Sequence, residues 1–315
     1  MPELAEVETV RKYLDKTMRG KKIKEVEVDL NDKYLFAFAK PADVKKSLEG
    51  AKVIGTGRRG KYFWLDFNRG PSLIIHLGMS GNVSIRLPKL KRGVPARTTN
   101  QEHLHIWDGI ALQSEGEKSR KAGNSKAPQH NGRDREDRPE HLWFCRLLFR
   151  LSDGSEIALL DPRRFGRVWL SDDPLKHPRI AKLGPDPLID FPSVQDLFLK
   201  LHRRKTSIKA ALLDQSLFAG IGNWLADEIL FQAKMSPHRK ASDLTPKDVA
   251  VLRKSVLAVV KKAVSVSADY ERFPKTWLFH HRWGKSKTAK ISTGAKIIHE
   301  SIGGRTAAWV PSVQK

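Results

Sequence analysis

The sequence predicts an α+β protein with two domains: a β-rich N-terminal domain that begins with a long helix, and a mainly helical C-terminal domain. Three observations support this. Apolar residues first recur at intervals of three and four. Alternating apolar residues then dominate to about residue 170, and helical periodicity returns after about residue 176. A chain of 315 residues is long enough to form two domains.

In the N-terminal half, the first helix is predicted from an apolar stripe on one face: Val7, Val10, Leu14 and Met18. We expect a half-buried strand over residues 22–30 and a hairpin over 53–67. A short buried run follows at 73–75. Residues 142–170 are predicted as two strands around a turn at 152–154.

The segment from about residue 88 to 138 interrupts this pattern. It is rich in charged residues and has few large apolar side chains. Such a composition cannot bury enough surface to offset the entropy of ordering. We therefore predict that most of residues 88–138 is a disordered insertion, with a short ordered island at 103–112.

In the C-terminal half, we predict short helices over residues 196–202 and 208–213 and a further helix over 223–233. A longer helix begins after Thr245, which is an N-cap residue followed by Pro246 at the first helical position. The chain closes with strand patterns around the Gly303–Gly304 turn. The predicted division is residues 1–175, 176–270 and 271–315.

Charge indicates the class of partner. The chain carries 58 Lys and Arg residues against 35 Asp and Glu, a net charge of +23. That excess is typical of a protein that binds a polyanion such as nucleic acid. Cys145 is the only cysteine, which excludes an intramolecular disulfide and a cysteine-based zinc site. No apolar run is long enough to span a bilayer, so we expect a soluble intracellular protein.

The first residues suggest chemistry. Removal of the initiator Met would leave Pro2 with a free α-amino group, which titrates near pH ~8 and can attack a sugar aldehyde carbon. Glu3 is adjacent, and Glu6 lies about one helical turn further on. An amine beside two carboxylates can perform acid–base catalysis. The same residues are also ordinary at a helix N-terminus, and taken alone they favour that interpretation.

Further blocks change this balance. The start, Met1-Pro2-Glu3-Leu4-Ala5-Glu6, is followed in order by the blocks Arg58-Arg59-Gly60-Lys61-Tyr62, His76-Leu77-Gly78-Met79-Ser80-Gly81, Asp161-Pro162-Arg163-Arg164-Phe165-Gly166 and Leu212-Leu213-Asp214-Gln215 with Ala219-Gly220-Ile221-Gly222-Asn223. Together they resemble the formamidopyrimidine-DNA glycosylase (Fpg/Nei) family, with Ala5 where proline is usual. The resemblance implies a β-sandwich-like N-terminal domain and a helix–two-turns–helix motif in the C-terminal domain.

The resemblance also implies roles for residues. Pro2 would attack the sugar C1′, Glu3 would protonate the ring oxygen, Glu6 would assist, and Lys61 would hold a phosphate and favour strand cleavage. These four are the expected catalytic residues. A flipped base leaves a gap in the stack, which Met79, Arg163 and Phe165 would fill. Lys209, Asn223 and Arg305 would contact phosphates.

The C-terminus departs from the bacterial pattern. One cysteine cannot form the four-cysteine zinc finger common there. Residues 298–315 instead resemble the zincless β-hairpin finger of the plant and fungal branch, and we expect neither a metal nor a cofactor. We expect the hairpin to fold by packing, with these apolar residues as candidates: Ile297, Ile302, Trp309 and Val310.

The expected function is a bifunctional DNA glycosylase and abasic-site lyase of base excision repair. It would remove oxidised purines (formamidopyrimidines, hydantoins and 8-oxoguanine), and its partner would be damaged double-stranded DNA. One alternative is an oxidised-pyrimidine, Nei-like preference, and another is a nucleic-acid-binding protein without catalysis. The resemblance implies a monomer that is nuclear in a eukaryote, with mitochondria as a second location, and cytoplasmic otherwise.

Overall fold

The structure is a computed structural model that describes residues 1–88, 103–105, 142–284, 286 and 288–315. Backbone contacts divide the chain into two compact units. Unit 1 comprises residues 1–2, 7–58 and 62–177, and unit 2 comprises 3–6, 59–61 and 178–315. Residues 3–6 and 59–61, which come from the β-rich half of the sequence, therefore belong to the helical unit 2. The predicted division used continuous ranges and could not include such segments. Most of the expected insertion lies outside the described residues.

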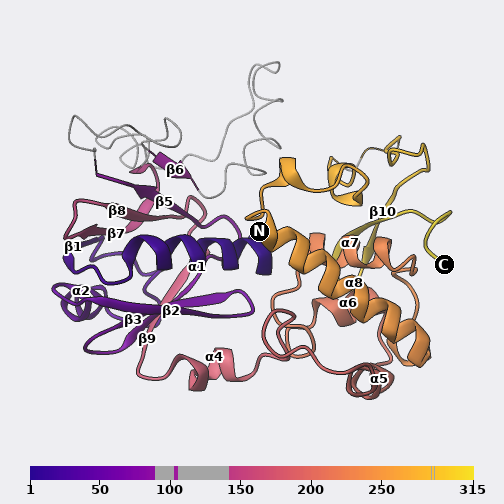
Figure 1. Cartoon of the computed structure of the whole chain (residues 1–315), viewed down its shortest axis with the longest axis horizontal. Helices are drawn as coiled ribbons and strands as arrows, with labels where there is room; N and C mark the ends of the chain where they lie inside the picture. Colours follow the sequence, from indigo (N-terminus) through magenta and orange to yellow (C-terminus); the bar gives the residue numbers. More distant parts are fainter. Residues whose placement is uncertain (89–102, 106–141, 285, 287) are drawn as a thin grey trace. The chain divides into compact units, whose positions relative to one another are not determined.

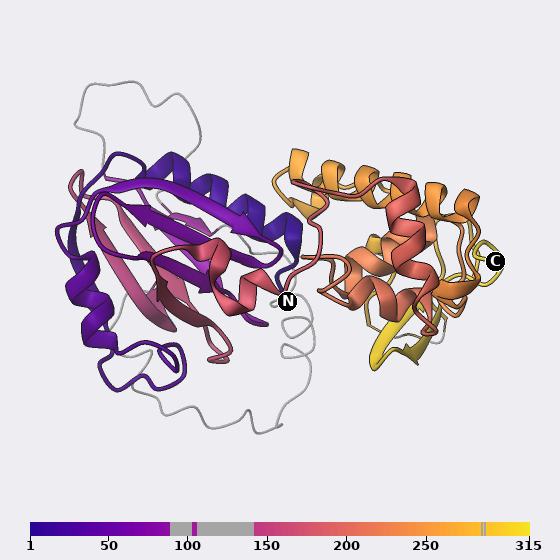
Figure 2. The same cartoon turned by 90° about the horizontal axis from the view of Figure 1, so that it is seen from below.

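Unit 1 contains two antiparallel sheets (Figures 1 and 2). The first has the order β1-β7-β8-β5-β6, with these bounds: β1 Ile23–Val28, β7 Cys145–Leu151, β8 Glu156–Leu160, β5 Asn82–Arg86 and β6 His103–His105. The second has the order β2-β3-β4-β9, with these bounds: β2 Val53–Arg59, β3 Tyr62–Phe67, β4 Ser72–His76 and β9 Arg167–Ser171.

One hydrophobic core joins the sheets to the first helix, α1 (Leu4–Met18). Its members include Val26 of β1, Phe63 of β3 and Phe149 of β7. The apolar stripe predicted for the first helix is buried in this core, which confirms that helix. Two sheets that share a core confirm the β-sandwich-like domain.

Three elements of unit 1 were not predicted: strand β5, a third strand from residues 142–170, and helix α2. Residues 142–170 contribute three strands, because β9 pairs with β4 in the second sheet while β7 and β8 belong to the first. Helix α2 (Pro41–Leu48) is too short for a clear period, and tertiary packing of Val44 and Leu48 stabilises it. Within the expected insertion, β6 pairs with β5.

Unit 2 is mainly helical, with these bounds: η3 Pro174–Lys176 just before it, then α4 Pro178–Ala181, α5 Val194–His202, α6 Ile208–Leu213, α7 Asn223–Gln232, η4 Ala241–Asp243, α8 Pro246–Ser265, η5 Tyr270–Arg272 and η6 Leu278–His280. Helix α6 has the predicted bounds. Thr245 caps α8, and its hydroxyl and the Asp248 carboxylate form the reciprocal bonds of a capping box.

The C-terminal hairpin consists of β10 (Ile298–Ile302) and β11 (Arg305–Trp309). Gly303 and Gly304 have φ of 60° and 74°, the left-handed conformation that a two-residue hairpin turn requires. A small core contains Ile297 and Val310, two of the four expected residues, together with Leu278, Ile291 and Ala308. Ile302 is buried but lies outside this core, and Trp309 is only half-buried. None of the helices in the described ranges is long and apolar enough to cross a membrane.

Candidate active site and nucleic-acid interface

The Glu3 carboxylate is fixed at the start of helix α7. Its Oε2 accepts hydrogen bonds from the backbone N–H groups of Gly222 (3.0 Å) and Leu225 (3.1 Å), and its Oε1 accepts one from Trp224 (2.9 Å). A helix N-terminus attracts negative charge through these unpaired N–H groups. A Cβ atom at position 222 would lie 2.2 Å from Glu3 Cδ. Only glycine permits this approach, so Gly222 is part of the site.

Glu6 is fully buried beside Glu3. Its Oε2 accepts the Glu3 backbone N–H at 3.0 Å, and its Oε1 accepts the Trp224 indole N–H at 2.9 Å and the Tyr270 hydroxyl at 3.1 Å. Burial, reinforced by the Glu3 charge, raises the pKa of Glu6 to about 8. Glu6 therefore holds a proton at neutral pH and can act as an acid.

Lys61 lies at the tip of the β2–β3 hairpin. Its Nζ donates to the Ile221 carbonyl at 3.2 Å, and the adjacent Gly60 N–H donates to Asp186 Oδ2 at 2.8 Å. Burial lowers the pKa of Lys61 and the Arg305 charge lowers it further, whereas Glu3 and Glu6 act in the opposite direction. The structure thus brings Glu3, Glu6 and Lys61 together, with Arg305 within electrostatic reach of Lys61.

Pro2 directly precedes Glu3 and lies outside helix α1. Consecutive Cα atoms are about 3.8 Å apart, so connectivity alone keeps residue 2 beside the fixed carboxylate. The Leu4 N–H donates to the Gly220 carbonyl at 3.0 Å, which anchors the chain just after the acid. The Pro2 nitrogen, as a nucleophilic amine, would therefore lie next to the fixed carboxyl group of Glu3.

Met79, Arg163 and Phe165 lie on two touching loops of unit 1. Met79 and Phe165 are exposed apolar side chains, and the Arg163 guanidinium lies 5.0 Å from the Phe165 ring centroid. A Cβ atom at Gly78 would lie 2.4 Å from the Phe165 carbonyl carbon, so the Met79 turn packs directly on the second loop. Exposed apolar residues at adjacent loop tips suit insertion into a base stack.

Asp161 holds these loops together, although it was not among the predicted site residues. It is buried and accepts hydrogen bonds from the Ser80 hydroxyl (3.0 Å), the Gly166 N–H (2.5 Å) and the Arg163 N–H (3.3 Å). It therefore links the Met79 turn to the loop that carries Arg163 and Phe165. A buried carboxylate that accepts several N–H and O–H groups fixes a loop more firmly than neutral contacts do.

We expect Asp161→Asn to cost about 1–3 kcal/mol in the free energy of unfolding, because an amide N–H₂ would then face the Gly166 N–H or the Ser80 hydroxyl. Excision should fall as the loops lose their position. Thermal unfolding and single-turnover excision measure the two effects. Ser80→Ala, which removes one bond and leaves the carboxylate intact, is the control and should have a smaller effect. Equal effects of the two variants would contradict this role.

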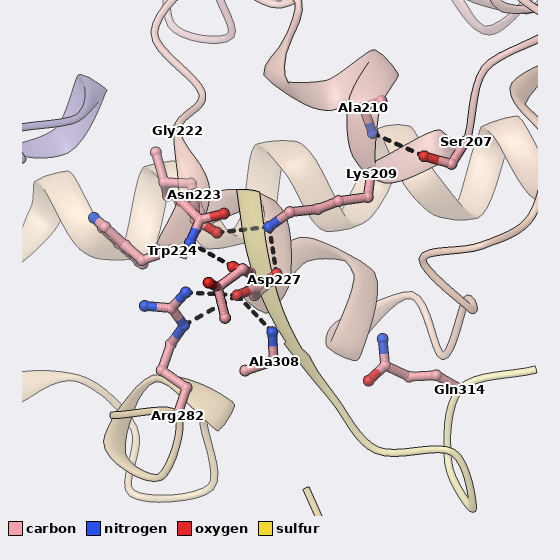
Figure 3. A network of polar contacts seen from close by, with 12 residues as sticks. Ser207, Lys209, Ala210, Gly222, Asn223, Trp224, Asp227, Arg282, Ala308 and Gln314 are labelled. Atoms are coloured by element: carbon pink, nitrogen blue, oxygen red, sulfur yellow. Dashed lines mark hydrogen bonds and ion pairs between the residues drawn. The ribbon is translucent and has the colours of Figure 1, made fainter. Parts of the chain in front are cut away.

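The structure places Lys209 and Asn223 in one buried network with Asp227 (Figure 3). The Lys209 ammonium donates to the Asn223 carbonyl at 2.9 Å and forms an ion pair with Asp227, and its side chain is fully buried. This burial argues against the predicted phosphate contact, since a phosphate cannot reach the ammonium. Lys209 instead supports the first turn of α7.

Asn223 remains suited to a phosphate contact. Its Nδ2 donates to the Thr306 carbonyl at 2.9 Å, which uses one of its two N–H bonds. The other can serve a ligand at the start of α7. Arg305, the residue before Thr306, is exposed at the first position of β11. Asn223 and Arg305 are therefore linked through the hairpin backbone.

Asp227 also attaches the C-terminal hairpin to α7. Its Oδ2 accepts the Arg282 guanidinium at 2.5 Å and the Ala308 N–H at 3.1 Å (Figure 3). In the hairpin turn, a Cβ atom at Gly303 would lie 2.7 Å from the Cβ of Ala210 in α6. Packing alone was expected to hold this hairpin, and two hydrogen bonds to α7 add to it: one from the Ala308 N–H to Asp227 and one from Asn223 Nδ2 to the Thr306 carbonyl. Among the described residues, no group of three or more His, Cys, Asp or Glu side chains could hold a metal.

Sequence reasoning missed Asp227, Trp224 and Tyr270. One signal for Asp227 existed, because Asp227 and Glu228 are the only charged residues of the mainly apolar helix α7, and buried charges need partners. For Trp224 and Tyr270 no local signal existed. Their partner, Glu6, is more than 200 positions away in sequence.

Comparisons with known families agree with this geometry. The Formamidopyrimidine-DNA glycosylase N-terminal domain family matches residues 1–168, and the Formamidopyrimidine-DNA glycosylase H2TH domain family matches residues 183–274. A formamidopyrimidine-DNA glycosylase of Arabidopsis thaliana is 34% identical over the whole chain and 71% of its own length. One from Neisseria meningitidis is 30% identical over the full length of both proteins.

Solved structures of Lactococcus lactis Fpg are also similar. One is a complex with DNA containing an abasic site, with 25% identity, 99% coverage of both chains and a TM-score of 0.71. Another is the wild-type protein bound to DNA containing a benzyl-Fapy-dG, with 25% identity, 100% coverage of both chains and a TM-score of 0.71. Because two family domains cover most of the sequence and the whole fold is shared, this chain belongs to the formamidopyrimidine-DNA glycosylase family.

Proposed function

We propose that this DNA glycosylase of base excision repair removes oxidised purines from duplex DNA and then cleaves the strand as an abasic-site lyase. The observation that carries the proposal is the carboxylate of Glu3, which three N–H groups fix directly beside Pro2. Curated relatives named as formamidopyrimidine-DNA glycosylases support the same substrate class. The expected partner is damaged double-stranded DNA.

In the proposed first step, the lone pair of the Pro2 amine forms a bond to the sugar C1′. The Glu3 carboxylate takes the amine proton and passes it to the ring oxygen as the ring opens. The bond between C1′ and the base also breaks, so that the base leaves with the bonding electrons and takes a proton from water. The amine nitrogen keeps no proton and becomes an iminium. Loss of a C2′ proton then expels the 3′ phosphate, and a second elimination expels the 5′ phosphate.

The phosphates are proposed to bind to Lys61, Arg305 and Asn223. Burial lowers the pKa of Lys61, and the positive charge of Arg305, which repels the ammonium, lowers it further. A phosphate between two such cations would relieve that repulsion. Met79, Arg163 and Phe165 are proposed to fill the gap that the flipped nucleotide leaves.

Substrate choice is tested with four duplexes, each carrying one lesion: a formamidopyrimidine, a hydantoin, 8-oxoguanine or an oxidised pyrimidine. We expect the purine-derived lesions to be excised faster than the oxidised pyrimidine under single-turnover conditions. Faster excision of the pyrimidine would favour the Nei-like alternative. Binding without excision of any lesion would favour a non-catalytic nucleic-acid-binding protein.

We expect Arg305→Ala to weaken binding to a duplex with an abasic-site analogue and to lower the salt slope of the binding constant by about one unit, because one phosphate contact is lost. Excision should also slow, since a misplaced phosphate misplaces the sugar. Binding titrations at several salt concentrations measure the slope. Lys261→Ala, an exposed charge on α8, is the matched control. An unchanged affinity and rate for Arg305→Ala would contradict the assignment.

The C-terminal hairpin is proposed to work without metal. Its contacts with α6 and α7 come from the Gly303 turn and from Asp227, and neither requires coordination. The plant relative supports a eukaryotic repair enzyme, and a nuclear location is the proposed site of action.

A further inference from the structure

We propose that Tyr270 is a positioning residue for catalysis, whose hydroxyl holds the Glu6 carboxyl group in one place in both of its protonation states. The inference rests on the proposed function, because it concerns Glu6, to which the family resemblance gives an assisting role in excision. Tyr270 lies in the 3-10 helix η5 and is remote from Glu6 in the sequence. Neither the family resemblance nor the sequence pattern indicated a role for it.

Three hydrogen-bond donors surround the Glu6 carboxyl group. The Trp224 indole N–H and the Tyr270 hydroxyl share Oε1, and the Glu3 backbone N–H reaches Oε2. Tyr270 is itself held by aromatic neighbours, since its ring centroid lies 4.7 Å from that of Phe279 and 5.4 Å from that of Phe273. The hydroxyl therefore has a fixed place beside the carboxyl group.

Of these three partners, the tyrosine alone can serve a carboxyl group that gains and loses a proton. The indole and the backbone N–H are donors and nothing else. When Glu6 is protonated, its own O–H needs an acceptor in a buried site, and an unpaired O–H there is costly. The Tyr270 hydroxyl can donate a hydrogen bond to the Glu6 carboxylate and can accept one from the protonated carboxyl group.

Both protonation states are accessible near neutral pH. The charged or titratable groups that act on Glu6 are Glu3, which precedes it on the same segment, Lys61 of the β2–β3 hairpin, and Tyr270. Burial raises the pKa of Glu6 to about 8. Burial likewise raises the pKa of Tyr270 well above its ordinary value, so the phenol keeps its proton while Glu6 titrates. The pair can thus exchange donor and acceptor roles without moving.

Tyr270→Phe removes this one hydroxyl and keeps the ring. A hydrogen bond to the carboxylate is lost, and a charged acceptor loses more than a neutral one. The falling alkaline limb of single-turnover excision, which lies near pH 8 in the wild type if protonated Glu6 is the active form, should therefore move to higher pH. The maximal rate should fall about tenfold. Affinity for a duplex with an abasic-site analogue should not change.

Three companion variants sharpen the test on a duplex with one formamidopyrimidine. Glu6→Gln should abolish the alkaline limb, and Tyr270→Phe added to it should cause no further loss. Replacing Tyr270 with 3-fluorotyrosine keeps the shape but strengthens the donor, so the limb should move to lower pH. Tyr13→Phe is the control and should leave the profile unchanged, because Tyr13 is a partly buried residue that packs against the core of unit 1.

The possible results separate the inference from the proposed function. Opposite shifts for Tyr270→Phe and 3-fluorotyrosine would support the inference, even if Tyr270→Phe were less stable. A profile that matches the wild type, or a loss of equal size in the Glu6→Gln background, would overturn it while leaving the proposed function intact. A wild-type chain that excises no lesion would instead overturn the proposed function, and this inference with it.

Discussion

Borohydride is expected to trap the protein on lesion-containing DNA through Pro2, and a chain that retains Met1 or an N-terminal tag is expected to give no adduct and no excision. In the blocked chain the nitrogen is an amide, whose lone pair is delocalised and cannot attack C1′. The carboxylate of Glu3, which three N–H groups fix next to this residue, supports Pro2 as the proposed nucleophile. Denaturing gels show the adduct, and peptide mapping shows the attached residue.

The blocked chain also needs a binding control. It should still bind a duplex with an abasic-site analogue, since Arg305 and Asn223 are unchanged. An adduct on a lysine such as Lys61 in the blocked chain would contradict the mechanism. Loss of binding as well as trapping would show that the added residues disturb the fold of the N-terminus.

Glu3→Gln is expected to reduce base excision by roughly 10²- to 10⁴-fold, the usual contribution of general acid catalysis. An amide cannot protonate the sugar ring oxygen. Its oxygen can replace Oε2 and keep the bonds from Gly222 and Leu225, while its N–H₂ group faces the Trp224 N–H. The Trp224 N–H, which is part of the cap of helix α7, therefore loses its acceptor. The other two bonds keep the start of α7 in place, so DNA affinity should change little.

Single-turnover excision and binding are measured together for Glu3→Gln. Glu271→Gln, an exposed carboxylate in the same unit, is the matched control and should behave like the wild type. Excision at the wild-type rate by Glu3→Gln would remove Glu3 from the mechanism. A parallel loss of affinity would assign the effect to the cap of α7 rather than to proton transfer.

The sequence by itself determined much of the fold. The first helix, helix α6 and the capped helix α8 depend on local periodicity and local capping, which are visible in a few neighbouring residues. The Gly303–Gly304 turn depends on a backbone conformation that glycine favours. Motif blocks in order also indicated the family and placed Glu3, Glu6 and Lys61 in the same predicted site.

Only the tertiary structure decided which polar groups are buried and with what they pair. Lys209 looks like any basic residue near a phosphate-binding turn, yet it is buried against Asp227. Glu6 looks like an ordinary acid of a first helical turn, yet Trp224 and Tyr270 enclose it. The physical reason is that burial and pairing depend on segments far apart in the sequence, whereas periodicity and capping report only near neighbours.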